Sequence, residues 1–131
     1  MTGLVLLLGI SGGCSAPVCR GDIGEPMRIY TLFFGLAVAG APDVSDQQWA
    51  AFRDRVITPH VPDGYTVLDA QGAWRATDSQ RTVTERSKML IVALPDRQQS
   101  ADAISQIRAA YQTMFHQQSV GLIVQPGCAA F

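Results

Sequence analysis

The fold is decided by one apolar stretch, RIYTLFFGLAV at residues 28–38. Large apolar side chains fill both alternating sets of positions, with Tyr30 and Phe34 in one set and Phe33 in the other. A strand that is apolar on both faces is typical of the centre of a sheet. A second run, KMLIVAL at residues 88–94, has the same character and predicts a second central strand.

A helix is predicted after the first strand. Ser45 and Gln48 form a capping-box pattern, which places the N-cap at Ser45. Apolar side chains then follow at helical spacing, at Trp49, Phe52 and Val56. We expect Pro59 and Pro62 to end this helix.

The remaining periodicity predicts two further strands and one further helix, and it extends the strand at 88–94 back to residue 81. We expect strands at 65–75, 81–94 and 120–124 and a helix at 100–116. The resulting order, β-α-β-β-α-β, is the ferredoxin-like arrangement of an α+β fold. Right-handed crossovers then give an antiparallel sheet of spatial order 4-1-3-2, with both helices on one face. The two doubly apolar strands are the first and third, as this order requires.

The cysteines provide an independent test of that topology. Strands 1 and 4 are antiparallel neighbours, so Cys19 before strand 1 and Cys128 after strand 4 come together. We therefore predict a Cys19–Cys128 disulfide, worth up to about 4–5 kcal/mol in the chain-entropy model. No Cys-x-x-Cys is present and the two histidines are distant from the cysteines, so we expect no metal site.

The N-terminus indicates export. An apolar run at residues 4–10 is too short to span a membrane and is followed by small residues before Cys14. We expect residues 1–16 to be a signal peptide or lipoprotein signal, 17–27 a tether, and 28–131 a single domain. The expected location is the periplasm or cell envelope, with lipidation of Cys14 as the only membrane attachment. A buried N-terminal strand is the alternative, and Ser11 departs from the usual lipoprotein pattern.

The charge balance limits the partners. The chain has ten basic and eleven acidic residues, for a net charge of −1. A nucleic-acid binder would carry a basic excess, so no nucleic-acid partner is expected. Since strand 1 is apolar on both faces, we expect the helix-free face of the sheet to pair with a second copy in a homodimer. The N-terminal tether is an alternative cover.

Candidate site residues gather at one end of the predicted sheet. They are Asp69, Trp74, Arg75, Glu85, Arg86, His116 and Gln117. Such residues could form an acid/base or anion-binding pocket. They are equally explained as a solvated cross-strand charge set, a packing tryptophan and a helix-dipole histidine. The other histidine, His60, is expected at the opposite end, and neither a P-loop nor a strand-linked G-x-G-x-x-G is present, so no cofactor is expected.

Several segments resemble a family of uncharacterised bacterial exported proteins, known only as a domain of unknown function. The segments are 30–35 (YTLFFG), 49–52 (WAAF), 59–75 (PHVPDGYTVLDAQGAWR), 85–88 (ERSK), Tyr111, 115–120 (FHQQSV) and 128–131 (CAAF). The resemblance covers roughly residues 28–131. It implies export, often with a lipoprotein-like N-terminus, and a small α+β domain. It implies no activity and no catalytic residues.

Two functions therefore stay open. The first is an exported, non-enzymatic binding or interaction module of the cell envelope. The second is a cofactor-independent small-molecule enzyme of the dimeric α/β-barrel type. A deep, partly apolar pocket lined by the candidate residues favours the enzyme, whereas a filled interior with those residues in solvent favours the module.

Overall fold

The computed structural model describes residues 19–21, 23–75 and 79–131. Expectations for residues 1–16, including lipidation of Cys14, and for residues 17, 18 and 22 of the tether lie outside the described residues. The elements, in chain order, are β1 (Glu25–Gly35), α1 (Asp46–Phe52), η1 (Arg53–Ile57), α2 (Thr58–His60), β2 (Thr66–Arg75), β3 (Thr82–Leu94), α3 (Gln98–Phe115) and β4 (Gly121–Ala129). No helix within the described ranges is long and apolar enough to cross a membrane.

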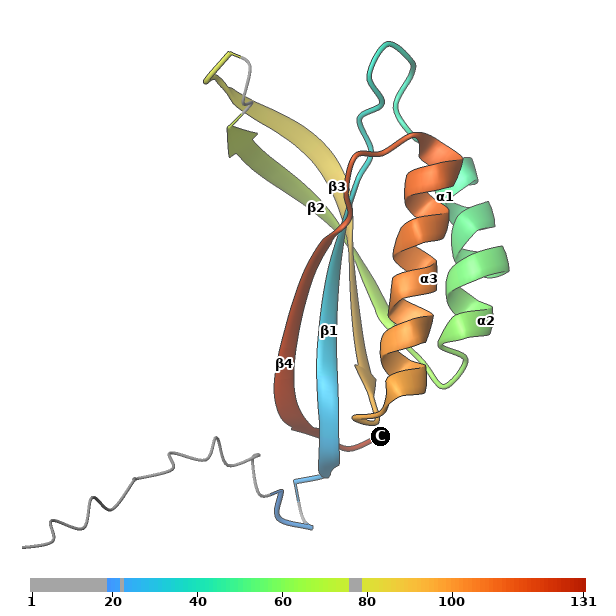
Figure 1. The fold of residues 1–131 in the computed structure, drawn as a ribbon, viewed down its shortest axis with the longest axis vertical. Helices are drawn as coiled ribbons and strands as arrows, with labels where there is room; N and C mark the ends of the chain where they lie inside the picture. Colours follow the sequence, from blue (N-terminus) through green and yellow to red (C-terminus); the bar gives the residue numbers. More distant parts are fainter. Residues whose placement is uncertain (1–18, 22, 76–78) are drawn as a thin grey trace, which may run out of the picture.

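The four strands form one antiparallel sheet in the order β2-β3-β1-β4. This is the predicted order, with the two doubly apolar strands, β1 and β3, at the centre. In the register, Leu32 of β1 lies opposite Leu90 of β3 and Leu122 of β4. Both helical segments, α1-η1-α2 and α3, cover the same face of the sheet (Figure 1). The protein is therefore an α+β domain with a helix-covered face and a helix-free face.

Two strands, β1 and β4, have boundaries that differ from the expected ones. β1 begins at Glu25, so the last residues of the predicted tether are strand, and it ends at Gly35 rather than at Val38. β4 continues to Ala129 instead of stopping at 124, because it pairs with the early part of β1. Pro126 is tolerated inside β4 because β4 is an edge strand, where a missing N–H need not interrupt a ladder.

A disulfide closes one end of the β1–β4 pair, where β1 begins and β4 ends. Cys19 and Cys128 are bonded, with Cα atoms 5.7 Å apart. The prediction from strand order is thus confirmed. The bond links the segment before β1 to the last residues of β4, at the end of the sheet remote from the β2–β3 hairpin (Figure 1).

The first helical segment starts as predicted and ends between Pro59 and Pro62, the two prolines expected to end it. The N–H of Gln48 donates to Ser45 Oγ at 3.2 Å, and the N–H of Ser45 donates to Gln48 Oε1 at 2.9 Å. Pro59 does not end the helix, which continues to His60. The turns before it widen into the π-helix η1, in which the N–H of Thr58 donates to the Arg53 carbonyl. This wider turn gives the proline ring room that a regular α-helical turn lacks.

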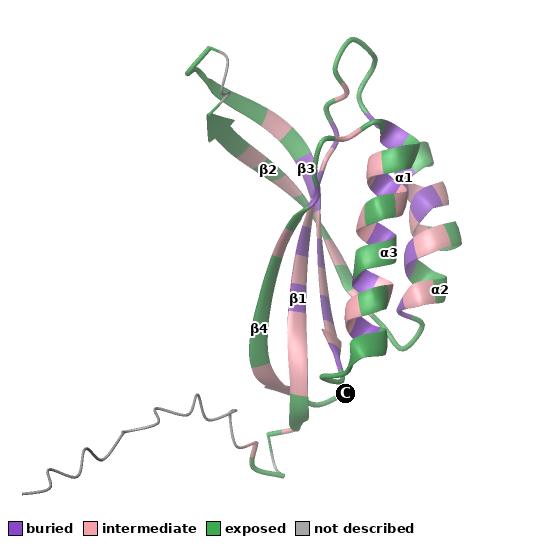
Figure 2. Ribbon diagram, viewed as in Figure 1, coloured by how far each residue is buried: buried purple, intermediate pink, exposed green. Residues whose placement is uncertain are grey.

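The core lies between the helices and the sheet (Figure 2). Its centre is a set of aromatic rings packed mainly edge to face: Phe34, Trp49, Phe52, Tyr111 and Phe115. The hydroxyl of Tyr111 donates to the Gly35 carbonyl at 2.8 Å. This hydrogen bond fixes the last residue of β1 to α3.

Candidate functional site

A pocket of about 730 Å³ lies at the end of the sheet where the β2–β3 hairpin diverges from the loops that follow β1 and α3. Side chains alternate along a strand, so Trp74 and Glu85 project from the helix-free face, opposite to the buried Leu90. The lining residues are Phe33, Gly35, Ala37, Val38, Ala39, Gly72, Ala73, Trp74, Val83, Glu85, Ser87, His116, Gln117, Gln118, Ser119 and Gly121. The lining is mostly apolar.

Glycines create the space around Glu85. Gly72 lies directly opposite Glu85 in the β2–β3 ladder, and a Cβ built there would meet no atom within 4 Å. Gly35 lies on the other side, where an added Cβ would come within 3.0 Å of Glu85 Oε1. Gly121 is similarly close to Phe33, whose Cβ would lie 3.2 Å from an added Cβ. The carboxylate of Glu85 therefore packs closely on Gly35 of β1, while the open space at Gly72 leaves it accessible from the β2 side.

Glu85 is a half-buried carboxylate without a protein partner. No residue in the described ranges donates a hydrogen bond to it or forms a salt bridge with it. The hydroxyl of Tyr111, which the charge of Glu85 influences, donates to the Gly35 carbonyl instead. Burial raises the pKa of Tyr111, and the negative charge of Glu85 adds to that increase. Glu85 thus acts electrostatically on its surroundings while its oxygens stay available.

The loops on the far side of the pocket are held by specific contacts. His116 ends α3 in a left-handed conformation (φ 52°), and its N–H donates to the Gln112 carbonyl. The side chain of Gln117 donates to the Ala37 carbonyl at 2.7 Å, which joins the loop after α3 to the loop after β1. Across the pocket, Trp74 is 49% exposed. An exposed indole and an anchored loop therefore face each other across the pocket.

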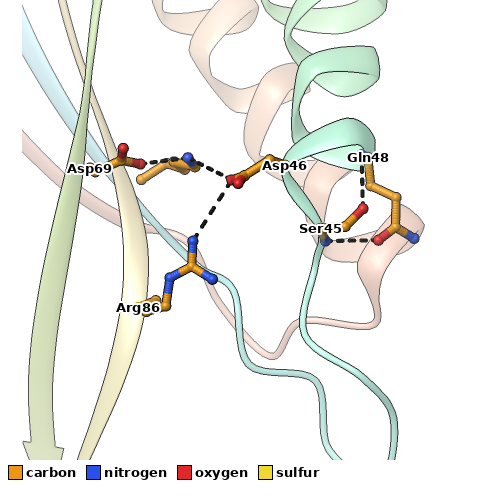
Figure 3. A network of polar contacts seen from close by, with 6 residues as sticks. Ser45, Asp46, Gln48, Asp69 and Arg86 are labelled. Atoms are coloured by element: carbon orange, nitrogen blue, oxygen red, sulfur yellow. Dashed lines mark hydrogen bonds and ion pairs between the residues drawn. The ribbon is translucent and has the colours of Figure 1, made fainter.

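A separate charged cluster occupies the opposite, helix-covered face. Lys88 Nζ donates to Asp69 Oδ1 at 2.5 Å and to Asp46 Oδ1 at 3.1 Å. Arg86 adds a longer contact to Asp46 at 3.8 Å. Figure 3 shows Asp46 reaching from the start of α1 towards the strands that carry Asp69 and Arg86. The Lys88 side chain is only 9% exposed, whereas those of both aspartates are mostly exposed.

The ionisation of this cluster follows from its contacts. The hydrogen bond from Lys88 and the positive charge of that residue hold the pKa of Asp69 below its ordinary value of 3.8. The hydrogen bond to Asp69, opposed by desolvation and aided by Asp46, raises the pKa of Lys88. The cluster is therefore a charged, mutually satisfied connection between α1 and the sheet.

The structure divides the residues that the sequence suggested as one pocket. Trp74, Glu85, His116 and Gln117 line the same pocket. Asp69 and Arg86 lie on the other face of the sheet, in the Lys88 cluster. Arg75 is exposed at the end of β2 and is not part of the lining. The pocket therefore lacks the expected anion-binding groups, because neither Arg75 nor Arg86 lines it.

His60 lies at the other end of the domain, as expected from its position after the first helix. Its Nδ1 is 2.7 Å from the Val56 carbonyl and its Nε2 is 2.9 Å from Gln106 Oε1. Both ring nitrogens therefore have partners on the helices. In the described part of the chain, no group of three or more His, Cys, Asp or Glu side chains is placed to hold a metal ion.

Sequence reasoning missed several residues that shape the two sites. Phe33, Gly35 and Gly121 line the pocket, and Asp46 and Lys88 complete the charged cluster. Lys88 carried a usable signal, because it is the chain's single lysine and it begins an apolar strand. A charge at a buried strand position needs a partner, and that requirement points to the acidic residues nearby.

Comparison with known proteins identifies a family and a fold. A family model described as "Protein of unknown function (DUF3574)" matches residues 29–131. No curated protein matches the chain in sequence. A phage SAM lyase in complex with S-methyl-5'-thioadenosine has a similar structure, with a TM-score of 0.60 at 17% identity, over 86% of this chain and 97% of that one. The apo state of a phage SAM lyase gives 0.59 at 16% identity, over 87% and 98% of the two chains. Identities this low establish similarity of fold alone.

Proposed function

The chain belongs to the DUF3574 family of proteins of unknown function, and we propose that it is an exported cell-envelope domain that binds a small organic ligand in the pocket around Glu85. We also assign it to the ferredoxin-like arrangement, which is supported by the β-α-β-β-α-β order and the β2-β3-β1-β4 sheet. The observation that carries the binding function is an accessible carboxylate without a protein partner in a mostly apolar pocket.

The size and lining of the pocket support a ligand about as large as a nucleoside. Its volume of about 730 Å³ falls within the usual range for small-molecule sites, about 300–1,000 Å³. Trp74 and Phe33 provide aromatic surface, while Glu85 and His116 provide polar contacts. A mostly apolar lining with few polar groups is the usual composition of such sites.

Binding can be tested with S-methyl-5'-thioadenosine, a ligand of nucleoside size. The full chain is titrated with this probe while backbone amide and indole signals are followed by NMR. We expect saturable shifts at Trp74, Gly72 and Gly121, and their loss in Trp74→Ala. Shifts confined to the region of His60, or none at millimolar probe, would contradict binding of nucleoside-sized ligands in this pocket.

Export is supported by the N-terminal sequence and by the disulfide. The apolar run at 4–10 followed by Cys14 is typical of an exported chain, and disulfides persist in oxidising compartments. We propose lipidation of Cys14 as the membrane attachment. Expression of the full chain in a bacterial host, with radiolabelled palmitate, tests this. Label that disappears in Cys14→Ala, but not in Cys19→Ala, is expected, whereas an unlabelled chain in the cytoplasmic fraction would refute both proposals.

We also propose a homodimer through the middle of the helix-free face. The positions there are apolar or uncharged: Ile29, Thr31, Leu68, Ala70, Met89, Ile91, Ala93, Ile123 and Gln125. Two copies related by a two-fold axis would meet there without like-charge repulsion. Leu68 and Ile123 are 41% and 48% exposed in the single chain, so apolar surface remains to be buried.

The oligomeric state tests this partner. Ile91 lies at the centre of the face, between Thr31 of β1 and Thr66 of β2. Light scattering during size-exclusion chromatography should give a dimer for the natural chain and a monomer for Ile91→Glu. The matched variant Ala109→Glu, at an exposed position of α3, should stay dimeric. A natural chain that is monomeric at high concentration would exclude the homodimer.

A cofactor-independent enzyme is the second candidate. It is favoured by one observation, that Glu85 and His116 line the same pocket, because paired acid and base groups serve proton transfer. The similar fold of a phage SAM lyase suggests SAM as the first substrate to try. Consumption of SAM that requires both Glu85 and His116 would favour the enzyme. Binding without consumption would leave the protein as a binding module.

A further inference from the structure

We propose that the pocket around Glu85 selects organic cations over neutral ligands of the same shape. The proposal rests on the binding function proposed above and adds the ligand's charge. It follows from three features of the described residues: the free carboxylate of Glu85, the absence of lysine and arginine from the pocket lining, and the aromatic surface of that lining.

The electrostatics of the lining favour a cation. Among the residues that the structure describes, Glu85 is the only carboxylate in the lining, and no lysine or arginine accompanies it. Arg86, its neighbour in sequence, points to the opposite face and contacts Asp46. No lysine or arginine of the lining therefore neutralises the negative charge of Glu85, and no salt bridge joins it to His116, the one histidine among the described lining residues. Apolar surroundings reduce dielectric screening, so the attraction for a bound cation is stronger than it would be in bulk water.

The lining also suits a cation that carries apolar groups. Phe33 and Trp74 belong to the pocket, and the faces of aromatic rings attract cations such as quaternary ammonium groups. Gly72 lies opposite Glu85 and has no atom within 4 Å of its Cβ position, so a bulky head group can approach the carboxylate from the β2 side. Alkyl groups on the cation would meet apolar lining rather than unsatisfied polar groups.

A metal ion fits this site less well. Calcium binds six to eight oxygen ligands, and magnesium requires octahedral geometry. The pocket offers a single carboxylate, and no suitable cluster of three or more ligating side chains exists within the described ranges. An anion is disfavoured by Glu85 itself. An organic monocation is the ligand class that one carboxylate and aromatic rings can satisfy together.

A pair of probes with equal shape and different charge tests the proposal. Choline carries a trimethylammonium group, and 3,3-dimethylbutan-1-ol replaces it with an uncharged tert-butyl group. Calorimetric titration of the full chain should give a choline dissociation constant at least about tenfold lower than that of the alcohol. Glu85→Gln should remove this preference. Glu25→Gln removes the same charge from the remote end of β1 and should leave the preference intact.

The outcomes separate this proposal from the one on which it rests. Equal affinity for the two probes, or a preference that survives Glu85→Gln, would overturn the cation proposal while the binding pocket stands. S-methyl-5'-thioadenosine binding without choline binding would do the same. If choline, its neutral counterpart and S-methyl-5'-thioadenosine all fail to bind, the proposed binding function fails as well.

Discussion

The two faces of the sheet use acidic residues of adjacent strands in opposite ways. On the helix-covered face, Asp69 accepts a hydrogen bond from Lys88, which also contacts Asp46 at the start of α1. On the helix-free face, Glu85 has neither a hydrogen-bond donor nor a salt-bridge partner among the described residues. A carboxylate satisfied by the protein stabilises the fold, whereas one left open to a pocket is available to a ligand. The presence or absence of a hydrogen-bonding or ion-pair partner, rather than the residue type, therefore distinguishes a structural carboxylate from a functional one.

The largest expected effect comes from removing the cation of the helix-covered cluster. Lys88→Met should lower the free energy of unfolding by about 2 kcal/mol, because two charge-assisted hydrogen bonds are lost while the exposed aspartates regain water. Urea denaturation measures it. Arg53→Met removes an exposed ion pair with Asp54 and should cost less. An equal loss in both variants would mean that the Lys88 cluster is no more structural than a surface pair.

The next effect comes from filling the pocket of the helix-free face. Gly72→Leu adds a side chain where nothing lies within 4 Å, next to Glu85. Binding of S-methyl-5'-thioadenosine should weaken by more than about tenfold. Stability should be unchanged or raised, because glycine costs conformational entropy in a strand. Gly21→Leu, also in open space but outside the sheet, is the control. Unchanged binding in Gly72→Leu would place the ligand elsewhere.

The pH dependence of stability should reveal the contribution of the Asp69–Lys88 contact on the helix-covered face. The pKa of Asp69 is lowered in the folded protein, so its contribution is fully present above the unfolded value, about 3.8, and is lost as pH falls through the folded pKa. Thermal melts between pH 6 and pH 2 should therefore lose stability less steeply in Asp69→Asn. Asp54, whose pKa is also lowered by Arg53, contributes with the same sign in both proteins. Identical slopes would count against the Asp69–Lys88 contact.

The smallest expected effect is on stability when Glu85 is neutralised. Glu85→Gln should change the free energy of unfolding by no more than about 0.5 kcal/mol, because no described contact is broken. The same urea titrations used for Lys88→Met provide the measurement. A loss comparable to that of Lys88→Met would show that Glu85 has a structural partner, and the contrast between the faces would disappear.

The fold was largely predictable because buried strands and helix faces have recognisable patterns of apolar residues in the sequence. The doubly apolar segments at 28–38 and 88–94 identified the central strands, and the resulting strand order correctly placed Cys19 beside Cys128. The failures concern backbone details. Pro59 was expected to end a helix, yet a π-helical turn accommodates it, and this depends on geometry that no residue pattern specifies.

The site was only half predictable because the sequence does not state which face a residue occupies. Asp69 and Glu85 were expected in one pocket, but strand alternation and register send them to opposite faces. A shift of one residue in the register moves a side chain to the other face of the sheet, so knowledge of the register would have separated the two acids. Gly35 and Gly121 were missed because their contribution is the absence of a side chain, which acquires meaning only when neighbouring strands are in place.

Carboxyl-carbon NMR during a choline titration tests the central contrast most directly, since it observes both acids in one sample. The Glu85 side-chain carboxyl signal should shift saturably, and the Asp69 signal should stay constant. A shift at Asp69 with none at Glu85, or no shift at either residue at saturating choline, would contradict this contrast.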